Sequence, residues 1–354
     1  MDYIEIAGYK SIYQERLELK PINLLIGANG SGKSNFISFF EFLNRLYHRN
    51  LHEYIALTGG ENKLLHKGQK LTNRISFKLE FENGTNGYSA NLQLGTNGFV
   101  FTDERLIYRS DRGADISSSD REARIKTTDN FRAKHVIRHL NGFRKYHFHD
   151  TSDKSPFTIL SNIETDTYYL YSNGSNLAAF LYGIRNNDKI VYNRIIKTIQ
   201  SIAPYFSDFE FIPNNEGFIR LLWKDKYSDS IYGATDLSDG TIRFIALTVL
   251  FLQPDLPDTI IIDEPELGLH PSAIAKLAGM IKSVSSKECQ VIVATQSTDL
   301  ISHFTPESII TVDQINGCSK FKRLDSKELQ EWLEDYTVDD LWKRNIISSG
   351  QPNF

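Results

Sequence analysis

The chain has 354 residues and a formal net charge of −4, which excludes a uniformly basic coat for nucleic acid but not a local basic patch. Its length allows one large domain with insertions or two domains. No apolar run approaches the roughly 18 residues that span a bilayer, and the chain opens without the basic and apolar regions of a signal peptide. We therefore expect a cytoplasmic protein without a membrane partner.

The first 47 residues are predicted to form a hairpin, a buried strand and a helix. Apolar residues alternate with polar ones over residues 3–19, which indicates an antiparallel hairpin. Residues 22–26 are mostly apolar, as in a central strand. From Asn35 to about Tyr47 the apolar residues recur at helical spacing, which predicts a helix with one apolar face.

The residues between this strand and helix, Gly27-Ala28-Asn29-Gly30-Ser31-Gly32-Lys33-Ser34, fit the pattern G-x-x-x-x-G-K-[ST]. Its glycines let backbone N–H groups face a phosphate, and the helix N-terminus adds partial positive charge. Lys33 is predicted to reach the β- and γ-phosphates, and the Ser34 hydroxyl to ligate Mg²⁺. The sequence therefore predicts a protein that binds ATP and Mg²⁺. The predicted binding residues are Asn29, Gly30, Ser31, Gly32, Lys33, Ser34 and Asn35.

The middle of the chain is predicted to hold two further parts. Residues 70–110 alternate between apolar and polar around two Asn- and Gly-rich breaks, which predicts an antiparallel β subdomain. Residues 111–128 are charged and serine-rich, as in a loop or linker. Residues 121–235 are predicted to form a mostly helical insertion or lid, with the clearest helices at 177–182 and 190–202.

The insertion begins with a basic segment, in which only Glu122 and Asp129 oppose the cations. The segment is either the solvated face of a helix or a contact surface for nucleic acid or an acidic partner. Its cations are Arg121, Arg124, Lys126, Arg132, Lys134, Arg138, Arg144 and Lys145.

After Tyr232 the pattern returns to alternating helices and strands, as in a parallel α/β sheet. The predicted strand 259–263 ends in Asp263, followed by Glu264. Ligands bind at the carboxyl ends of strands in such folds, so Asp263 is predicted to approach the Mg²⁺ held by Ser34. Glu264 is predicted to orient or deprotonate the attacking water. The alternative is a buried strand that ends at an acidic surface turn.

Gln296 follows the next predicted strand, residues 290–294, and is a candidate to sense the γ-phosphate or to hold the water. The alternative is a helix-capping neighbourhood around Ser297 and Thr298.

Three segments in this order, Gly27–Ser34, Leu237–Thr241 and Asp263–Pro271, resemble ABC-type ATPases of the RecF, SMC and OLD kind. The three segments resemble especially the compact AAA-domain ATPases of bacterial defence and repair systems. It implies an α/β fold: a P-loop NTPase head of ABC type, with an antiparallel β subdomain and a mostly helical insertion, in a single domain over 1–354. Residues 1–50 and 232–312 would be the nucleotide-binding core and residues 313–354 a C-terminal tail.

By the same resemblance, Leu237–Thr241 is similar to the ABC signature, in which Ser238, Asp239 and Gly240 face the γ-phosphate bound by a second protomer. The resemblance thus implies a homodimer with composite ATP sites. From the residues alone, the preferred interpretation is an ordinary helix cap, with Ser238 or Asp239 starting the helix near Thr241.

Weaker matches to the same ATPases occur at 146–152, 173–179 and 341–352, and they leave His149 and Asp150 either near the γ-phosphate or in a structural role. Two departures bear on hydrolysis. Gln296 stands where the family usually has a histidine, and no glutamine stands out at the Q-loop position. Losing one γ-phosphate contact costs on the order of 10²-fold in rate if it acts in the transition state.

The sequence as a whole predicts a Mg²⁺-ATP-dependent ATPase whose ATP-driven dimerisation switches a nucleic-acid-processing or anti-phage defence complex, with a separate effector or nuclease protein as partner. One alternative is a nucleotide-gated scaffold that does not hydrolyse ATP. Another is the nucleotide-binding subunit of an ABC transporter, which fits less well because about 200 residues separate the P-loop from the signature.

Overall fold

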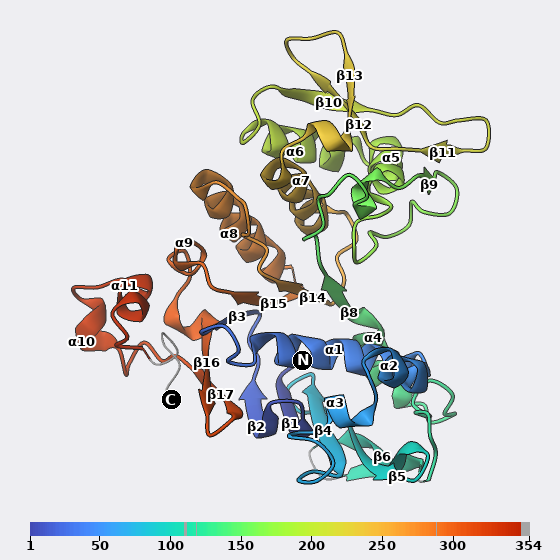
Figure 1. Ribbon diagram of the computed structural model, residues 1–354, viewed down its shortest axis with the longest axis vertical. Helices are drawn as coiled ribbons and strands as arrows, with labels where there is room; N and C mark the ends of the chain where they lie inside the picture. The colour runs from blue at the N-terminus through green and yellow to red at the C-terminus, as the bar shows by residue number, and fades with distance from the viewer. Residues whose placement is uncertain (110–111, 118, 288, 348–354) are drawn as a thin grey trace. The chain divides into compact units, whose positions relative to one another are not determined.

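The computed structural model describes every residue except 110–111, 118, 288 and 348–354 (Figure 1). The chain divides into two compact units. Unit 1 comprises Met1–Lys145, Asp258–Ile261 and Gln290–Phe354, and unit 2 comprises Tyr146–Pro257 and Ile262–Cys289. None of the described helices is long and apolar enough to cross a membrane.

The first sheet carries the P-loop strand. Its strand order is β17-β16-β3-β15-β14-β8, and β3 is parallel to both β15 and β16. β3 therefore lies inside the sheet, between β16 and β15. Its apolar run fits this position, because such a parallel strand is covered on both faces. The strands are β3 (Ile22–Ile26), β8 (Phe143–Tyr146), β14 (Thr259–Asp263), β15 (Gln290–Thr295), β16 (Ile309–Ile315) and β17 (Cys318–Arg323). From β8 and β14 the chain continues into unit 2.

The second sheet is antiparallel throughout, with the order β2-β1-β4-β5-β6-β7. Its strands are β1 (Tyr3–Tyr9), β2 (Ile12–Glu18), β4 (Arg74–Phe81), β5 (Asn86–Gly95), β6 (Gly98–Tyr108) and β7 (Arg112–Ser117). The predicted hairpin and β subdomain are confirmed, and they form one sheet. The loop predicted over 111–128 is wrong at β7, which pairs with β6; Asp111 and Ser118 lie outside the described residues.

Helix α1 (Lys33–Tyr47) packs between the two sheets of unit 1. Its phenylalanines form a continuous core with residues of both sheets. The Phe39 ring lies 5.0 Å from that of Tyr9 and 5.7 Å from that of Phe77, measured between centroids. Each buried side chain of this size stabilises the fold by about 1.5–3 kcal/mol. The core therefore fixes the helix that begins at the P-loop.

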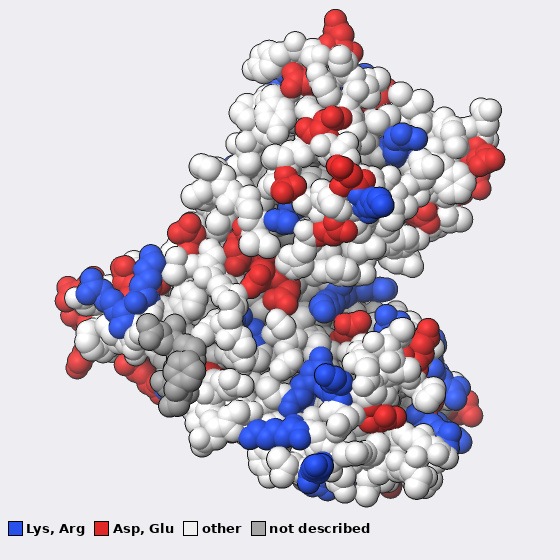
Figure 2. Space-filling view, in the orientation of Figure 1, with Lys and Arg blue, Asp and Glu red and all other residues white. Residues whose placement is uncertain are grey.

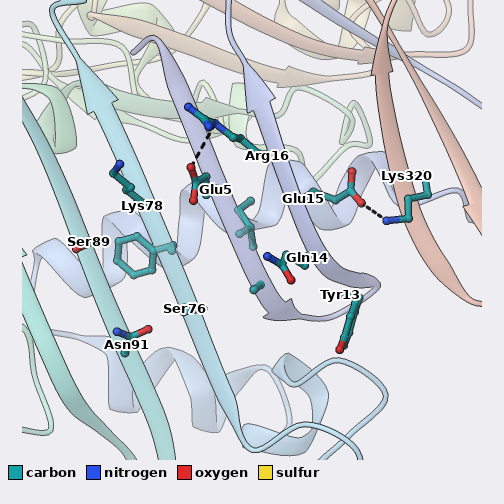
Figure 3. A pocket seen from close by; sticks show the side chains of 13 residues that line it. Glu5, Tyr13, Gln14, Glu15, Arg16, Ser76, Lys78, Ser89, Asn91 and Lys320 are labelled. Carbon is teal, nitrogen blue, oxygen red and sulfur yellow. Dashed lines mark hydrogen bonds and ion pairs between the residues drawn. The ribbon is translucent and has the colours of Figure 1, made fainter. Parts of the chain in front are cut away.

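The outer face of the antiparallel sheet is polar and carries an open groove of about 760 Å³ (Figure 3). Ion pairs cross this groove: Arg16 lies 3.3 Å from Glu5, and Lys320 lies 2.6 Å from Glu15. The second pair joins β2 to β17, and the Ser319 N–H also donates to the Ser11 carbonyl at 2.8 Å. The edges of the two sheets are thus held together next to the P-loop.

The remaining helices of unit 1 are α2 (Leu51–Leu57), α3 (Glu61–Leu64), α4 (Ala133–Gly142), α9 (Thr298–Ile301), α10 (Gln330–Leu333) and α11 (Val338–Lys343). The predicted core was expected to end at residue 312, but β16 and β17 extend its sheet to Arg323. Of the weak match at 341–352, residues 348–352 lie outside the described residues.

Unit 2 combines helices with short strands. Its helices are α5 (Leu177–Asn187), α6 (Lys189–Gln200), α7 (Asp239–Leu252) and α8 (Pro271–Ser285). Its strands are β9 (Ser161–Asn162), β10 (Phe206–Glu210), β11 (Phe218–Ile219), β12 (Leu222–Asp225) and β13 (Ile231–Gly233). Short 3₁₀ helices lie at Pro156–Thr158, Ala234–Asp236 and, in unit 1, Pro306–Ser308. The insertion over 121–235 therefore holds helices α4–α6 and also strands that the sequence pattern does not predict, because they are too short to show alternation.

Candidate functional site

The P-loop requires glycine where its backbone approaches neighbouring residues closely, at Gly27 and Gly32. Gly32 precedes α1 with a left-handed φ of 114°, and a Cβ there would collide with the side chain of Ser319. A Cβ on Gly27 would collide with the carbonyl oxygen of Val312. The loop is therefore packed tightly against the β16–β17 hairpin of unit 1.

The side chain of Lys33 is buried and bonds to its own loop. Its Nζ donates to the carbonyl oxygens of Gly27, at 2.6 Å, and Ala28, at 3.0 Å. Ser34 is exposed, and Gly32 at the N-cap offers no side chain to bond the first-turn N–H groups of α1. No acidic residue lies in that turn. These features fit a phosphate group at the helix N-terminus, with the Ser34 hydroxyl accessible to Mg²⁺.

The structure adds residues to this site that the sequence analysis missed. The Ser319 hydroxyl donates to the Ser31 carbonyl, and the Asn35 amide donates to the Ser11 hydroxyl, both at 2.7 Å. Lys10 and Ser11 lie with Asn35 along an open groove of about 780 Å³ that Lys63 and Lys67 also line. These residues come from the β1–β2 turn, the segment after α2 and β17, so only the topology brings them to the P-loop.

Gln296 follows the strand next to the P-loop strand. In the parallel register of β15 and β3, Thr295 is opposite Ile26, the last residue before Gly27. Ser297 caps α9, because its hydroxyl accepts from the Leu300 N–H at 3.1 Å. The cap that we gave as an alternative is therefore present, but it is made by Ser297. The half-buried Gln296 stays a candidate contact.

In unit 2, β14 ends at Asp263 and the chain turns sharply at Glu264. Ile260, Ile261 and Ile262 are buried, whereas both carboxylate residues are half-buried. Glu264 has a φ of 43°, in the left-handed region that non-glycine residues seldom adopt. Such conformations cost on the order of 1–3 kcal/mol and cluster at functional sites. Glu264 shares a positive φ with other described residues, among them Lys10 and Lys67, so the sequence motif and not the backbone marks it as a site candidate.

Helix α7 begins at the segment similar to the ABC signature. The Ser238 hydroxyl accepts from the Thr241 N–H at 3.3 Å, so Ser238 is the N-cap of this helix. The helix cap that the sequence offered as an alternative is therefore present. Ser238 and Asp239 are also exposed. Gly240 lies so close to the Gly268 carbonyl oxygen that a Cβ would collide with it. The signature segment and the loop after β14 are in direct contact.

Arg243, one turn into α7, connects three segments of unit 2. Its Nε donates to the Phe148 carbonyl and its Nη2 to the His149 carbonyl, both at 3.0 Å, and its Nη1 donates to the Leu267 carbonyl. Burial lowers the pKa of this guanidinium, and the charge of Asp239 opposes that shift. The three carbonyls satisfy a cation that would otherwise be costly to bury.

Beside this guanidinium is a small cavity of about 10 Å³, close to the volume that one water molecule occupies by the same measure. Asp263 and Glu264 line it together with Arg243 and His149. The other lining residues are Phe148, Leu247, Ile262 and Pro265. The predicted carboxylates and His149 are thus brought to one cavity of unit 2.

The P-loop before α1, the mixed sheet and the carboxylates of Asp263 and Glu264 at the end of β14 define a P-loop ATPase of ABC type. The chain belongs to the family described as "AAA domain, putative AbiEii toxin, Type IV TA system", which matches residues 22–302.

Solved structures with the same fold include SMC heads. An Smc head bound to the C-winged helix domain of ScpA is 17% identical, with a TM-score of 0.61 over 93% of this chain and 99% of that chain. The Smc head domain with an extended coiled coil bound to the C-terminal domain of ScpA, derived from Pyrococcus furiosus, is 15% identical, with a TM-score of 0.60 over 94% of this chain and 98% of that chain. At these identities the likeness shows the fold. No curated protein sequence matches the chain.

Proposed function

We propose that this protein is a Mg²⁺-ATP-dependent ATPase whose ATP-driven dimerisation switches a nucleic-acid-processing or anti-phage defence complex. The observation that supports the proposal is the P-loop itself, in which the buried Lys33 amino group bonds to its own loop and no side chain caps the helix that follows. On binding, Lys33 exchanges the carbonyls of Gly27 and Ala28 for β- and γ-phosphate oxygens.

In this proposal the hydroxyl of Ser34 and the carboxylate of Asp263 hold Mg²⁺, which neutralises charge on the β- and γ-phosphates when bound. Glu264 accepts a proton from the attacking water. The water oxygen forms a bond to the γ-phosphorus while the bond from that phosphorus to the β,γ-bridging oxygen breaks. The bridging oxygen keeps the electron pair and leaves as part of ADP.

The exposed start of α7 supports the composite site. Ser238 and Asp239 are exposed at this helix N-terminus, where the Ser238 hydroxyl and the partial positive charge of the helix favour a second protomer's γ-phosphate, while the Asp239 carboxylate in the same turn opposes it. Because the Smc heads of the same fold are bound to ScpA, we extend the proposal to a separate protein partner for this chain.

A cationic cluster at the C-terminal end of α1 favours nucleic acid as a ligand of the complex. The Lys126 amino group lies 5.3 Å from the centroid of the Tyr47 ring, at the end of α1, and burial, followed by the charges of Lys126, Arg144 and Arg45, lowers the pKa of the adjacent His48. Several cations of this region form ion pairs: Arg124 lies 2.9 Å from Asp120, Arg138 lies 3.5 Å from Asp258, and Arg45 lies 3.9 Å from Glu41. On the face seen in Figure 2, lysines and arginines gather over the part of unit 1 that carries α1 and β1.

A measurement of molar mass by light scattering, with and without Mg²⁺-ATP, tests the proposal when phosphate release is followed in parallel. We expect an ATP-dependent dimer and release of phosphate by the wild type. A chain that does not bind ATP would overturn the proposal. Tight ATP binding without phosphate release would instead support the non-hydrolysing scaffold, which Gln296 favours because it stands where the related ATPases have a histidine.

A further inference from the structure

The segment that follows β8 is anchored on both sides of His149. Phe148 is buried, with its ring centroid 6.1 Å from those of Tyr146 and Phe157. On the other side, the Asp150 carboxylate accepts from the Ser152 N–H at 3.0 Å and from the Ser152 hydroxyl at 2.7 Å, and these bonds lower its pKa. Asp150 is therefore engaged in its own turn, which leaves His149 as the available side chain.

Arg243 fixes the backbone of this segment. The guanidinium holds the consecutive carbonyls of Phe148 and His149 with two of its nitrogens and the Leu267 carbonyl with the third. A lysine cannot reproduce this fork, because its ammonium is a single point of charge. The arginine therefore sets the position of His149 relative to the loop that begins at Glu264.

The next observation is the small cavity that His149 shares with Glu264. His149 and Glu264 line the same space of about 10 Å³, which matches one water molecule. The imidazole is exposed, and within the described part of the chain it has no hydrogen-bond partner. A neutral imidazole nitrogen accepts a hydrogen bond from water, just as a carboxylate does.

We propose that His149 is a further catalytic residue, whose imidazole accepts a hydrogen bond from the water that Glu264 deprotonates, and that Arg243 is its positioning residue. This inference rests on the proposed ATPase function. Two acceptors on one water fix the direction of its lone pair, as attack on the γ-phosphorus requires. His149 thereby supplies a water contact for which no Q-loop glutamine stands out in this chain.

The test compares His149→Ala and His149→Gln with His147→Ala, a matched control at an exposed histidine that does not line the cavity. For His149→Ala we expect kcat to fall on the order of 10²-fold with ATP affinity and melting temperature unchanged. His149→Gln should restore part of the rate, since its amide oxygen also accepts a hydrogen bond. The control should match the wild type.

Arg243→Lys tests the positioning role. We expect it to lower kcat by a similar factor, and the double variant with His149→Ala to lose no more than either single variant, because both act on one contact. Losses that multiply in the double variant would refute the positioning role.

The outcomes separate this inference from the proposed function. If Glu264→Gln loses turnover while His149→Ala retains it, the catalytic role of His149 is wrong and the ATPase proposal stands. If the wild type itself releases no phosphate, both are refuted.

Discussion

The amino group of Lys33 lies 2.6 Å from the carbonyl oxygen of Gly27, so the P-loop closes around its own lysine. The same nitrogen bonds to the Ala28 carbonyl. A phosphate therefore competes with these carbonyls for the donors of the lysine, and the gain on binding is the difference between the charge-assisted contacts formed and any contacts given up.

The first prediction concerns this lysine. Lys33→Ala removes the only part of the P-loop pattern that carries a full positive charge, so we expect ATP affinity to fall by at least 10²-fold, which corresponds to about 2.7 kcal/mol. Titration with a fluorescent ATP analogue measures the loss. Lys70→Ala, at an exposed lysine outside the loop, should bind like the wild type. Equal affinity in both variants would remove Lys33 from the site.

The second prediction uses the strained backbone at Glu264. Glu264→Gly relieves a left-handed φ of 43°, so we expect a melting temperature equal to or above that of the wild type, with turnover lost. Glu264→Gln keeps the shape of the side chain and should accumulate the ATP-bound dimer. Scanning calorimetry and phosphate release give the two quantities. Turnover that survives in Glu264→Gln would exclude Glu264 as the base.

The neighbouring Gly268 provides the opposite case. It also has a positive φ, of 76°, and a Cβ there would lie 2.8 Å from Nη1 of Arg243. Gly268→Ala should therefore destabilise the fold by about 1–2 kcal/mol from backbone strain alone, and displace the guanidinium as well. A melting temperature equal to that of the wild type would show that the loop yields more easily than the structure implies.

The third prediction concerns nucleic acid. Contacts with phosphates make the affinity for DNA fall steeply with salt. The logarithm of the binding constant for a DNA duplex should therefore fall linearly with the logarithm of the salt concentration. Reversing the charges of Lys126 and Arg144 together should reduce both the affinity and this slope. Arg138→Glu is the control, because Arg138 is not among the cations that act on His48 and lies 3.5 Å from Asp258. If the wild type does not bind DNA at low salt, or if the control loses as much affinity as the double variant, this surface does not bind nucleic acid.

Local patterns predicted the nucleotide-binding core, while contacts between distant segments could not be predicted. The strand, P-loop and helix around Lys33 follow from a motif whose glycines and periodicity are local. The contact of Ser319 with the same loop depends on the β16–β17 hairpin, which joins the sheet beyond the predicted end of the core.

The sequence around Arg243 contains a signal for the contacts that this residue makes. It is a cation inside a helix whose residues from Ile242 to Leu252 are otherwise uncharged and all buried. A buried arginine must find acceptors, so the sequence could have predicted a clamp, although not that its acceptors are Phe148, His149 and Leu267. The short strands β9–β13 gave no comparable signal, because two to five residues cannot display a period.

The fourth prediction separates the two roles of Ser238, as helix cap and as signature residue. Ser238→Ala should cost about 1 kcal/mol of stability, because the Thr241 N–H loses its acceptor. Ser238→Asn keeps a side-chain oxygen that caps as well as serine, so its stability should match the wild type. If Ser238 also contacts the partner's γ-phosphate, both variants should lose the ATP-dependent dimer, since the longer amide cannot occupy the place of the hydroxyl. Light scattering with Mg²⁺-ATP and thermal unfolding measure the two effects independently. An asparagine variant that regains stability and dimerises normally would leave Ser238 as a cap alone, and the composite site would then have to lie elsewhere.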